Sequence, residues 1–92
     1  METIESAAFR FPDGVIFSMP RPARHHTLFL ELKRLREIGF SNRRPPHREE
    51  QGFLTSTGRF VDGTEGLAIA QAANQIIKKH ERAPILFSED MW

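Results

Sequence analysis

Two tight-turn signals constrain the fold of this chain more than any other feature of its sequence. They are the tripeptides Pro12-Asp13-Gly14 and Ser56-Thr57-Gly58, and short apolar segments flank both of them. The flanking segments are residues 9–11, 15–19, 53–55 and 59–61. Because glycine adopts the positive φ that such turns require, each signal predicts a β-hairpin.

A helical pattern follows the first predicted hairpin. Leu28, Leu32 and Leu35 recur at helical spacing within residues 23–38. Gly39 comes directly after this pattern, and glycine is typical of the residue that ends a helix. The sequence therefore predicts a helix over residues 23–38.

A second helical pattern follows the second predicted hairpin. Asp62 and Glu65 have the spacing of a capping box, which predicts a helix that begins there and runs to about His80. Its expected inner stripe is Ile69, Ala72, Ala73 and Ile76.

The order of these elements predicts an α+β fold, ββαββα, with a small antiparallel sheet covered by two helices. Ninety-two residues suffice for a single small domain over residues 1–92, with little room for a deep cavity. Residues 85–87 are expected to form either a short fifth strand or part of a packed tail. The last five residues, SEDMW, are either a docking segment or a chain end that Trp92 anchors in a surface groove, and anchoring is favoured. The expected core of the first hairpin is Phe9, Phe11, Val15, Phe17 and Met19.

Several classes of chemistry are disfavoured by composition. The chain has no cysteine, which excludes disulfides and thiolate nucleophiles. His25 and His26 are adjacent, so on a helix their side chains point about 100° apart and cannot hold one ion together. We expect no enzyme activity, no metal or other cofactor and no small-molecule substrate. The sequence has neither a signal peptide pattern nor a long apolar run, which predicts a cytoplasmic protein without a membrane partner.

The net charge of +1 conceals a strongly basic middle segment. Residues 21–48 carry a net charge of +6, whereas residues 1–20 carry −2 and residues 49–92 carry −3. Arginine outnumbers lysine ten to three, and its guanidinium binds phosphate or carboxylate through two parallel hydrogen bonds. The segment thus predicts a surface for nucleic acid or for an acidic protein, and the alternative is a solvated face. The predicted binding residues are Arg21, Arg24, Leu30, Lys33, Arg34, Arg43, Arg44 and Arg48.

Three segments carry a resemblance to a known group of proteins. They are FSMPRPARHHTL, QGFLTSTGRFVDGTEGLAIAQAANQI and LFSEDMW. Together they resemble a family of small proteins encoded by tailed bacteriophages and prophages, and the resemblance covers residues 15–92. It brings no catalytic residue with it.

The length and character of the chain are also similar to those of small phage inhibitors of host defence, in particular type I-F anti-CRISPR proteins. This resemblance implies a non-enzymatic protein in the cytoplasm of the bacterial host. Its implied partner is the host Cas surveillance complex, which consists of Cas proteins and guide RNA, bound through the Arg-rich surface. Two alternatives are a phage protein that binds double-stranded DNA, and a small metal-dependent phage enzyme that uses His25, His26 or His47.

Overall fold

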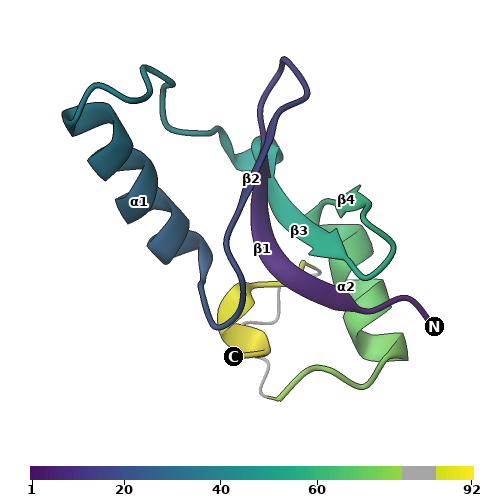
Figure 1. Ribbon diagram of the computed structural model, residues 1–92. Coiled ribbons are helices and arrows are strands. Elements are labelled where there is room, and N and C mark those ends of the chain that lie inside the picture. The colour runs from purple at the N-terminus through teal and green to yellow at the C-terminus, as the bar shows by residue number, and fades with distance from the viewer. Residues whose placement is uncertain (78–84) are drawn as a thin grey trace.

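Both predicted hairpins form, and they join edge to edge into one antiparallel sheet (Figure 1). The computed structural model describes residues 1–77 and 85–92. The strands follow the order β2-β1-β3-β4, so the first strand of each hairpin lies in the centre. The strands are β1 (Ile4–Arg10), β2 (Ile16–Ser18), β3 (Gln51–Thr55) and β4 (Phe60–Val61). The helices are α1 (His25–Glu37), α2 (Gly63–Ala72) and two short 3-10 helices, η1 (Arg48–Glu50) and η2 (Ser88–Asp90). The predicted α+β fold is confirmed.

The two hairpin turns have the same geometry. Gly14 and Gly58 both have positive φ, at 87° and 84°. In each turn the residue before the three-residue loop donates its N–H to the residue after it, from Phe11 to Val15 and from Thr55 to Arg59. A type I turn followed by a left-handed glycine produces this pattern, as the turn signals predicted.

Both helices pack on the same face of the sheet. Ala7 is paired with Phe53 and Phe53 with Val61, so these side chains share one face. One buried cluster lies under α1 and a second lies under α2 and the C-terminal segment, which Figure 1 shows between the start of α1 and α2. The first cluster is Ala7, Phe9, Phe11, Leu28 and Leu32, and the second is Ile4, Phe53, Val61, Ala70, Leu86 and Met91.

The two helices end in the same way, although the sequence predicted only one of the ends. After α1, Gly39 has φ 78° and Phe40 donates its N–H to the Leu35 carbonyl, which is the Schellman motif. After α2, Asn74 has φ 56° and Gln75 donates to the Ala70 carbonyl in the same motif. The prediction that the second helix runs to about His80 is therefore wrong; residues 78–80 lie outside the described residues.

The predicted inner stripe of the second helix is only partly right. Ile69 and Ile76 pack against the buried cluster, although Ile76 lies beyond the end of α2. Ala72 is exposed, and the fully buried positions of α2 are Gly66 and Ala70. Asp62 does accept the Glu65 N–H at 2.9 Å as an N-cap, but the Glu65 carboxylate binds Arg59 instead of reaching back to Asp62. A long-range partner has replaced the local contact of the capping box.

One residue of the predicted core, Val15, lies outside it, and the structure decides the conformation of residues 85–87. Val15 is 47% exposed because it lies at the tip of the first hairpin, beyond the reach of α1. Residues 85–87 form no strand, and Leu86 donates its N–H to the Gly63 carbonyl at the start of α2. The tail is anchored as expected, since Trp92 Nε1 donates to the Ala23 carbonyl at 2.9 Å.

Within the described ranges, no helix is both long and apolar enough to cross a membrane.

Candidate functional site

The predicted binding residues of the loop are largely engaged by the protein's own carboxylates. Arg43 donates two hydrogen bonds to Asp13, at 3.2 and 2.8 Å, and lies 4.7 Å above the Phe11 ring. Arg44 donates two to Glu50, at 2.7 and 2.9 Å. Arg44 and the His47 N–H together lower the pKa of Glu50 to about 2. These two arginines therefore hold the loop against the hairpin and against η1.

The predicted residues at the start of α1 gather around Trp92. Arg21 lies 5.6 Å above the indole ring and 4.0 Å from Glu5. Arg24 donates its Nε–H to the Trp92 carbonyl oxygen at 2.6 Å. This pair thus holds the C-terminal residue beside the start of α1.

The predicted residues on the outer face of α1 are exposed, as expected from the helical spacing. Lys33 and Arg34 form ion pairs along the helix with Glu37 and Glu31. Leu30 is 55% exposed on this face. Exposed pairs of this kind contribute little stability and leave the charges accessible.

Within residues 21–48, five of the eight basic side chains meet a carboxylate. In the described part of the chain, Arg24, Arg36 and Arg48 have no carboxylate partner. The arginines without a carboxylate partner therefore lie at the start of α1, in its last turn and in η1.

The C-terminal end of α1 combines exposed cations with exposed apolar side chains. We call Lys33, Arg36, Ile38 and Phe40 the α1-end surface. Ile38 is 62% exposed and Phe40 is 80% exposed. Lys33 and Arg36 line one shallow hollow with Ser41 and Asn42, and Phe40 lines the neighbouring hollow. Sequence reasoning missed Ile38, and it considered Phe40 for stacking without including it among the predicted binding residues, although both flank the helix-ending Gly39.

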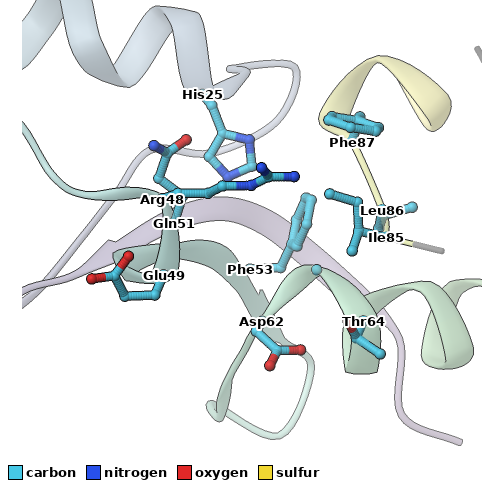
Figure 2. Close-up of a pocket in the computed structure, with 11 residues that line it drawn as sticks. His25, Arg48, Glu49, Gln51, Phe53, Asp62, Thr64, Ile85, Leu86 and Phe87 are labelled. Atoms are coloured by element: carbon cyan, nitrogen blue, oxygen red, sulfur yellow. The ribbon is translucent and has the colours of Figure 1, made fainter. Parts of the chain in front are cut away.

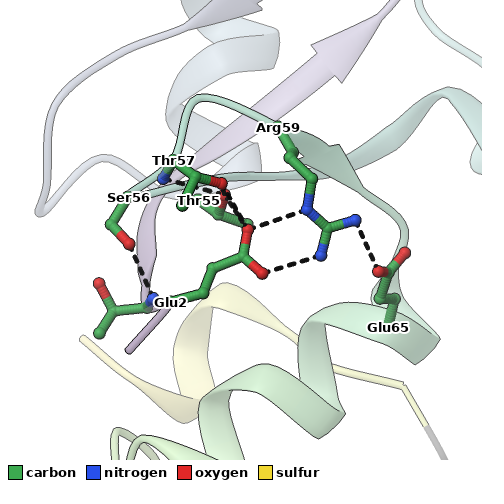
Figure 3. Close-up of polar contacts among 7 residues, drawn as sticks. Glu2, Thr55, Ser56, Thr57, Arg59 and Glu65 are labelled. Atoms are coloured by element: carbon green, nitrogen blue, oxygen red, sulfur yellow. Dashed lines mark hydrogen bonds and ion pairs between the residues drawn. The ribbon is translucent and has the colours of Figure 1, made fainter.

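A network at the start of the chain lay outside the predicted sites (Figure 3). Glu2 accepts hydrogen bonds from Arg59, at 2.9 and 2.8 Å, and from the hydroxyls of Thr55 and Thr57. These donors lower the pKa of Glu2 to about 2. The other side of Arg59 binds Glu65 at 2.8 Å. The network thus joins the segment before β1 to the second turn and to α2.

A cavity of about 250 Å³ opens beside His25, the first residue of α1 (Figure 2). The His25 ring lies among aromatic side chains, and its centroid is 6.0 Å from that of the Phe9 ring and 5.0 Å from that of the Phe53 ring. The Gly52 carbonyl lies 2.7 Å from His25 Nε2, and because a carbonyl only accepts, Nε2 carries the proton. Burial lowers the pKa of His25, which keeps the ring neutral.

The second ring nitrogen of His25 faces a serine. Ser88 Oγ lies 3.4 Å from Nδ1, and the same oxygen accepts the His25 backbone N–H at 3.3 Å. A serine beside a neutral imidazole has the form of a nucleophile and its base. Ser88 is only 1% exposed and does not line the cavity. The pair therefore joins α1 to the C-terminal segment, with the hydroxyl out of reach of a substrate.

His25 gives the protein a specific pH dependence. The pKa of His25 is lower in the folded state than in the unfolded state. As the pH falls below about 6.5, the unfolded state therefore binds more protons than the folded state, and the free energy of unfolding decreases. We expect His25→Gln to reduce the loss of unfolding free energy between pH 7.5 and pH 5, measured by urea denaturation. His26→Gln is the matched control, since His26 is exposed. An equal pH dependence in both variants would contradict this account of His25.

The three histidines that the structure describes, His25, His26 and His47, do not come together as a metal site. Among the residues that the structure describes, no group of three or more His, Cys, Asp or Glu side chains could hold a metal ion. His25 uses its ring nitrogens within the protein, while His26 and His47 are exposed on α1 and before η1.

A family model described as Phage T4 y16D protein matches residues 3–92. The match thus covers nearly the whole chain, including both hairpins, both helices and the C-terminal segment. The comparison with curated proteins and the comparison with solved structures gave no match.

Proposed function

Because this chain belongs to the phage T4 y16D protein family, we propose that it is a non-enzymatic phage protein that binds and inhibits a type I-F CRISPR–Cas surveillance ribonucleoprotein of the bacterial host. The family membership supports the phage origin. The choice of target draws on the resemblance of the chain to small phage inhibitors of host defence. The contact surface that we assign to this function is the α1-end surface, joined by the outer face of α1.

The observation that carries the proposal is the mixed chemistry of the α1-end surface. Arg36 has no carboxylate partner among the described residues, and Lys33 has only an exposed one at 3.8 Å. Phe40 and Ile38 expose large apolar side chains beside these cations. Cations bind RNA phosphates, whereas exposed aromatic side chains bury themselves against protein. A ribonucleoprotein offers both kinds of contact at once.

The structure changes which arginines should be tested. Arg43 and Arg44 each bind a carboxylate through two hydrogen bonds, and Glu50 is 9% exposed. Reversing the charge of Arg44 would leave the buried Glu50 carboxylate beside a like charge and disturb the fold. Arg36 carries no such structural bond, so its substitution reports on binding alone.

We expect Arg36→Glu to weaken binding to the purified surveillance complex by roughly tenfold, because it places a carboxylate where a phosphate or acidic side chain would lie. Phe40→Ser should also weaken binding, through the lost apolar contact. The measurement is equilibrium binding of the labelled protein at several salt concentrations. If three cations meet phosphates of a single strand, log K should fall with log salt at a slope of about −2.

The matched control is Arg48→Glu, which reverses another arginine without a carboxylate partner, in the cavity beside His25. Wild-type affinity of Arg36→Glu and Phe40→Ser, or an equal loss in Arg48→Glu, would refute the α1-end surface as the contact. Inhibition should be complete near one protein per complex and should persist in EDTA. Turnover that EDTA abolishes would favour the metal-dependent enzyme, and equal affinity for free duplex DNA would favour the DNA-binding protein.

A further inference from the structure

The strand β2 leaves hydrogen-bonding groups free at the edge of the sheet, because it lies at the end of the strand order. The Phe11 N–H donates to the Val15 carbonyl at 2.9 Å. Bonded and non-bonded pairs alternate along an antiparallel ladder, so the next residue of β2 that bonds to β1 is Phe17. The N–H and C=O groups of Ile16 and Ser18 therefore point away from β1. No residue that the structure describes bonds to them.

This edge lacks the features that usually keep edge strands apart, which are charged side chains, prolines and very short strands. Between the turn and Pro20 it has no charged residue and no proline. Val15 is 47% exposed and Ile16 is 39% exposed. At the opposite edge of the sheet, β4 has only two residues and lies between Arg59 and Asp62. The β2 edge is thus the better template for an added strand.

The β2 edge is complementary to a second copy of itself in the antiparallel orientation. When Phe17 lies opposite Phe17 of the second copy, Ile16 lies opposite Ser18. Each N–H of this pair then donates to the carbonyl of the other copy, and the two copies make identical bonds. On the face that carries the helices, the same register places Val15 opposite Met19. Pairing therefore covers the exposed Val15 side chain with another apolar side chain.

Charges at the two ends of the edge also favour the antiparallel orientation. Asp13 lies in the hairpin turn, and its side chain is 54% exposed although it binds Arg43. Arg21 follows Pro20 at the other end, where its side chain is 50% exposed and 4.0 Å from Glu5. An antiparallel second copy brings its Arg21 toward Asp13, whereas a parallel copy would bring like charges together.

We propose that the chain forms a symmetric homodimer in which the two β2 edges pair antiparallel about Phe17. The two sheets then become one continuous sheet with a two-fold axis, which is the commonest symmetry of soluble oligomers. No residue of the β2 edge belongs to the α1-end surface, so the dimer goes beyond the function proposed above and does not depend on it.

Sedimentation equilibrium of the full chain, from low micromolar to millimolar concentration, measures the dimerisation. We expect the mass to rise from one chain to two and to stop there, because a two-fold contact is closed. Amide hydrogen exchange by NMR then identifies the edge. The amides of Ile16 and Ser18 should exchange fast in the monomer and slowly in the dimer. The Phe17 amide should be protected in both states because it bonds to β1.

Variants separate the β2 edge from other surfaces. Ile16→Lys should weaken the dimer at least roughly tenfold, because two ammonium groups would lie near each other across the two-fold axis. Leu30→Lys makes the same change at an exposed side chain outside the edge and should dimerise like the wild type. Arg36→Glu should also dimerise normally, so each proposal can fail alone. Circular dichroism confirms that the variants fold.

Four results would overturn the proposal. They are a chain that stays monomeric at millimolar concentration, even if it pairs with a strand of another protein, a mass that rises beyond two chains, unchanged dimerisation in Ile16→Lys, and exchange of the Ile16 and Ser18 amides that does not slow as the dimer forms.

Discussion

Replacing Phe9 with alanine is expected to lower the free energy of unfolding by about 3–5 kcal/mol. Phe9 is fully buried in the centre of the sheet, where its ring lies 4.9 Å from Phe29 and 6.2 Å from Phe17. Removing the ring loses its apolar burial and leaves a cavity that the paired strands β1 and β3 cannot close. Domains of this size have a total stability of about 5–15 kcal/mol, so a large part would be lost. Chemical denaturation with urea measures the change.

Phe40→Ala is the matched control for Phe9→Ala, because it makes the same chemical change at a side chain that is 80% exposed. Its effect should stay within about 0.5 kcal/mol, as for most surface substitutions. Equal effects at the two positions would show that the cluster under α1 is not the core described above.

We expect Gly52→Ala to destabilise the protein by roughly 3 kcal/mol, at the upper end of the usual cost of overpacking. A Cβ at Gly52 would lie 2.1 Å from the Val61 carbonyl oxygen and 2.6 Å from Phe60 Cζ. The first of these atoms belongs to the backbone of β4, so β3 and β4 would have to separate. The Phe60 ring crosses Gly52 and is itself covered by Arg10, whose guanidinium carbon lies 4.8 Å from the ring centroid.

Gly66→Ala provides the comparison for this substitution. A Cβ at Gly66 would lie 3.2 Å from a ring carbon of Phe53, which is a side chain that can move by a few tenths of an ångström. The position is inside α2, where alanine is favoured over glycine by about 1 kcal/mol. The cost of the close contact with Phe53 and the gain in helix propensity nearly cancel, so denaturation should show a change in the free energy of unfolding within about 1 kcal/mol. A Gly52→Ala variant as stable as Gly66→Ala would contradict the close packing of β4 on β3.

The candidate sites were less predictable than the fold. The spacing of Lys33 and Arg34 placed them on the outer face of α1, where the structure has them. Arg43 and Arg44 looked equally free in the sequence, yet Asp13, thirty residues away, and Glu50 bind them. The cavity beside His25 had no sequence signal, because its wall comes from four separate segments.

The sequence by itself determined the features that depend on neighbouring residues. Gly14 and Gly58 set the two hairpin turns, Asp62 begins α2 and Gly39 ends α1, since each acts through its own backbone conformation or through an N–H within three residues. Asn74 could have been recognised on the same ground, because asparagine also tolerates positive φ after a helix.

Only the tertiary structure decided which distant segments meet. The pairing of β1 with β3 made Ala7 and Phe53 neighbours, and the packing of α1 on the sheet placed His25 beside Gly52. The same pairing brought Glu2 to Arg59 across fifty-seven residues and turned Glu65 away from its local capping contact. Such contacts depend on the burial of one common sheet face, a property of the assembled chain that no short window of sequence contains.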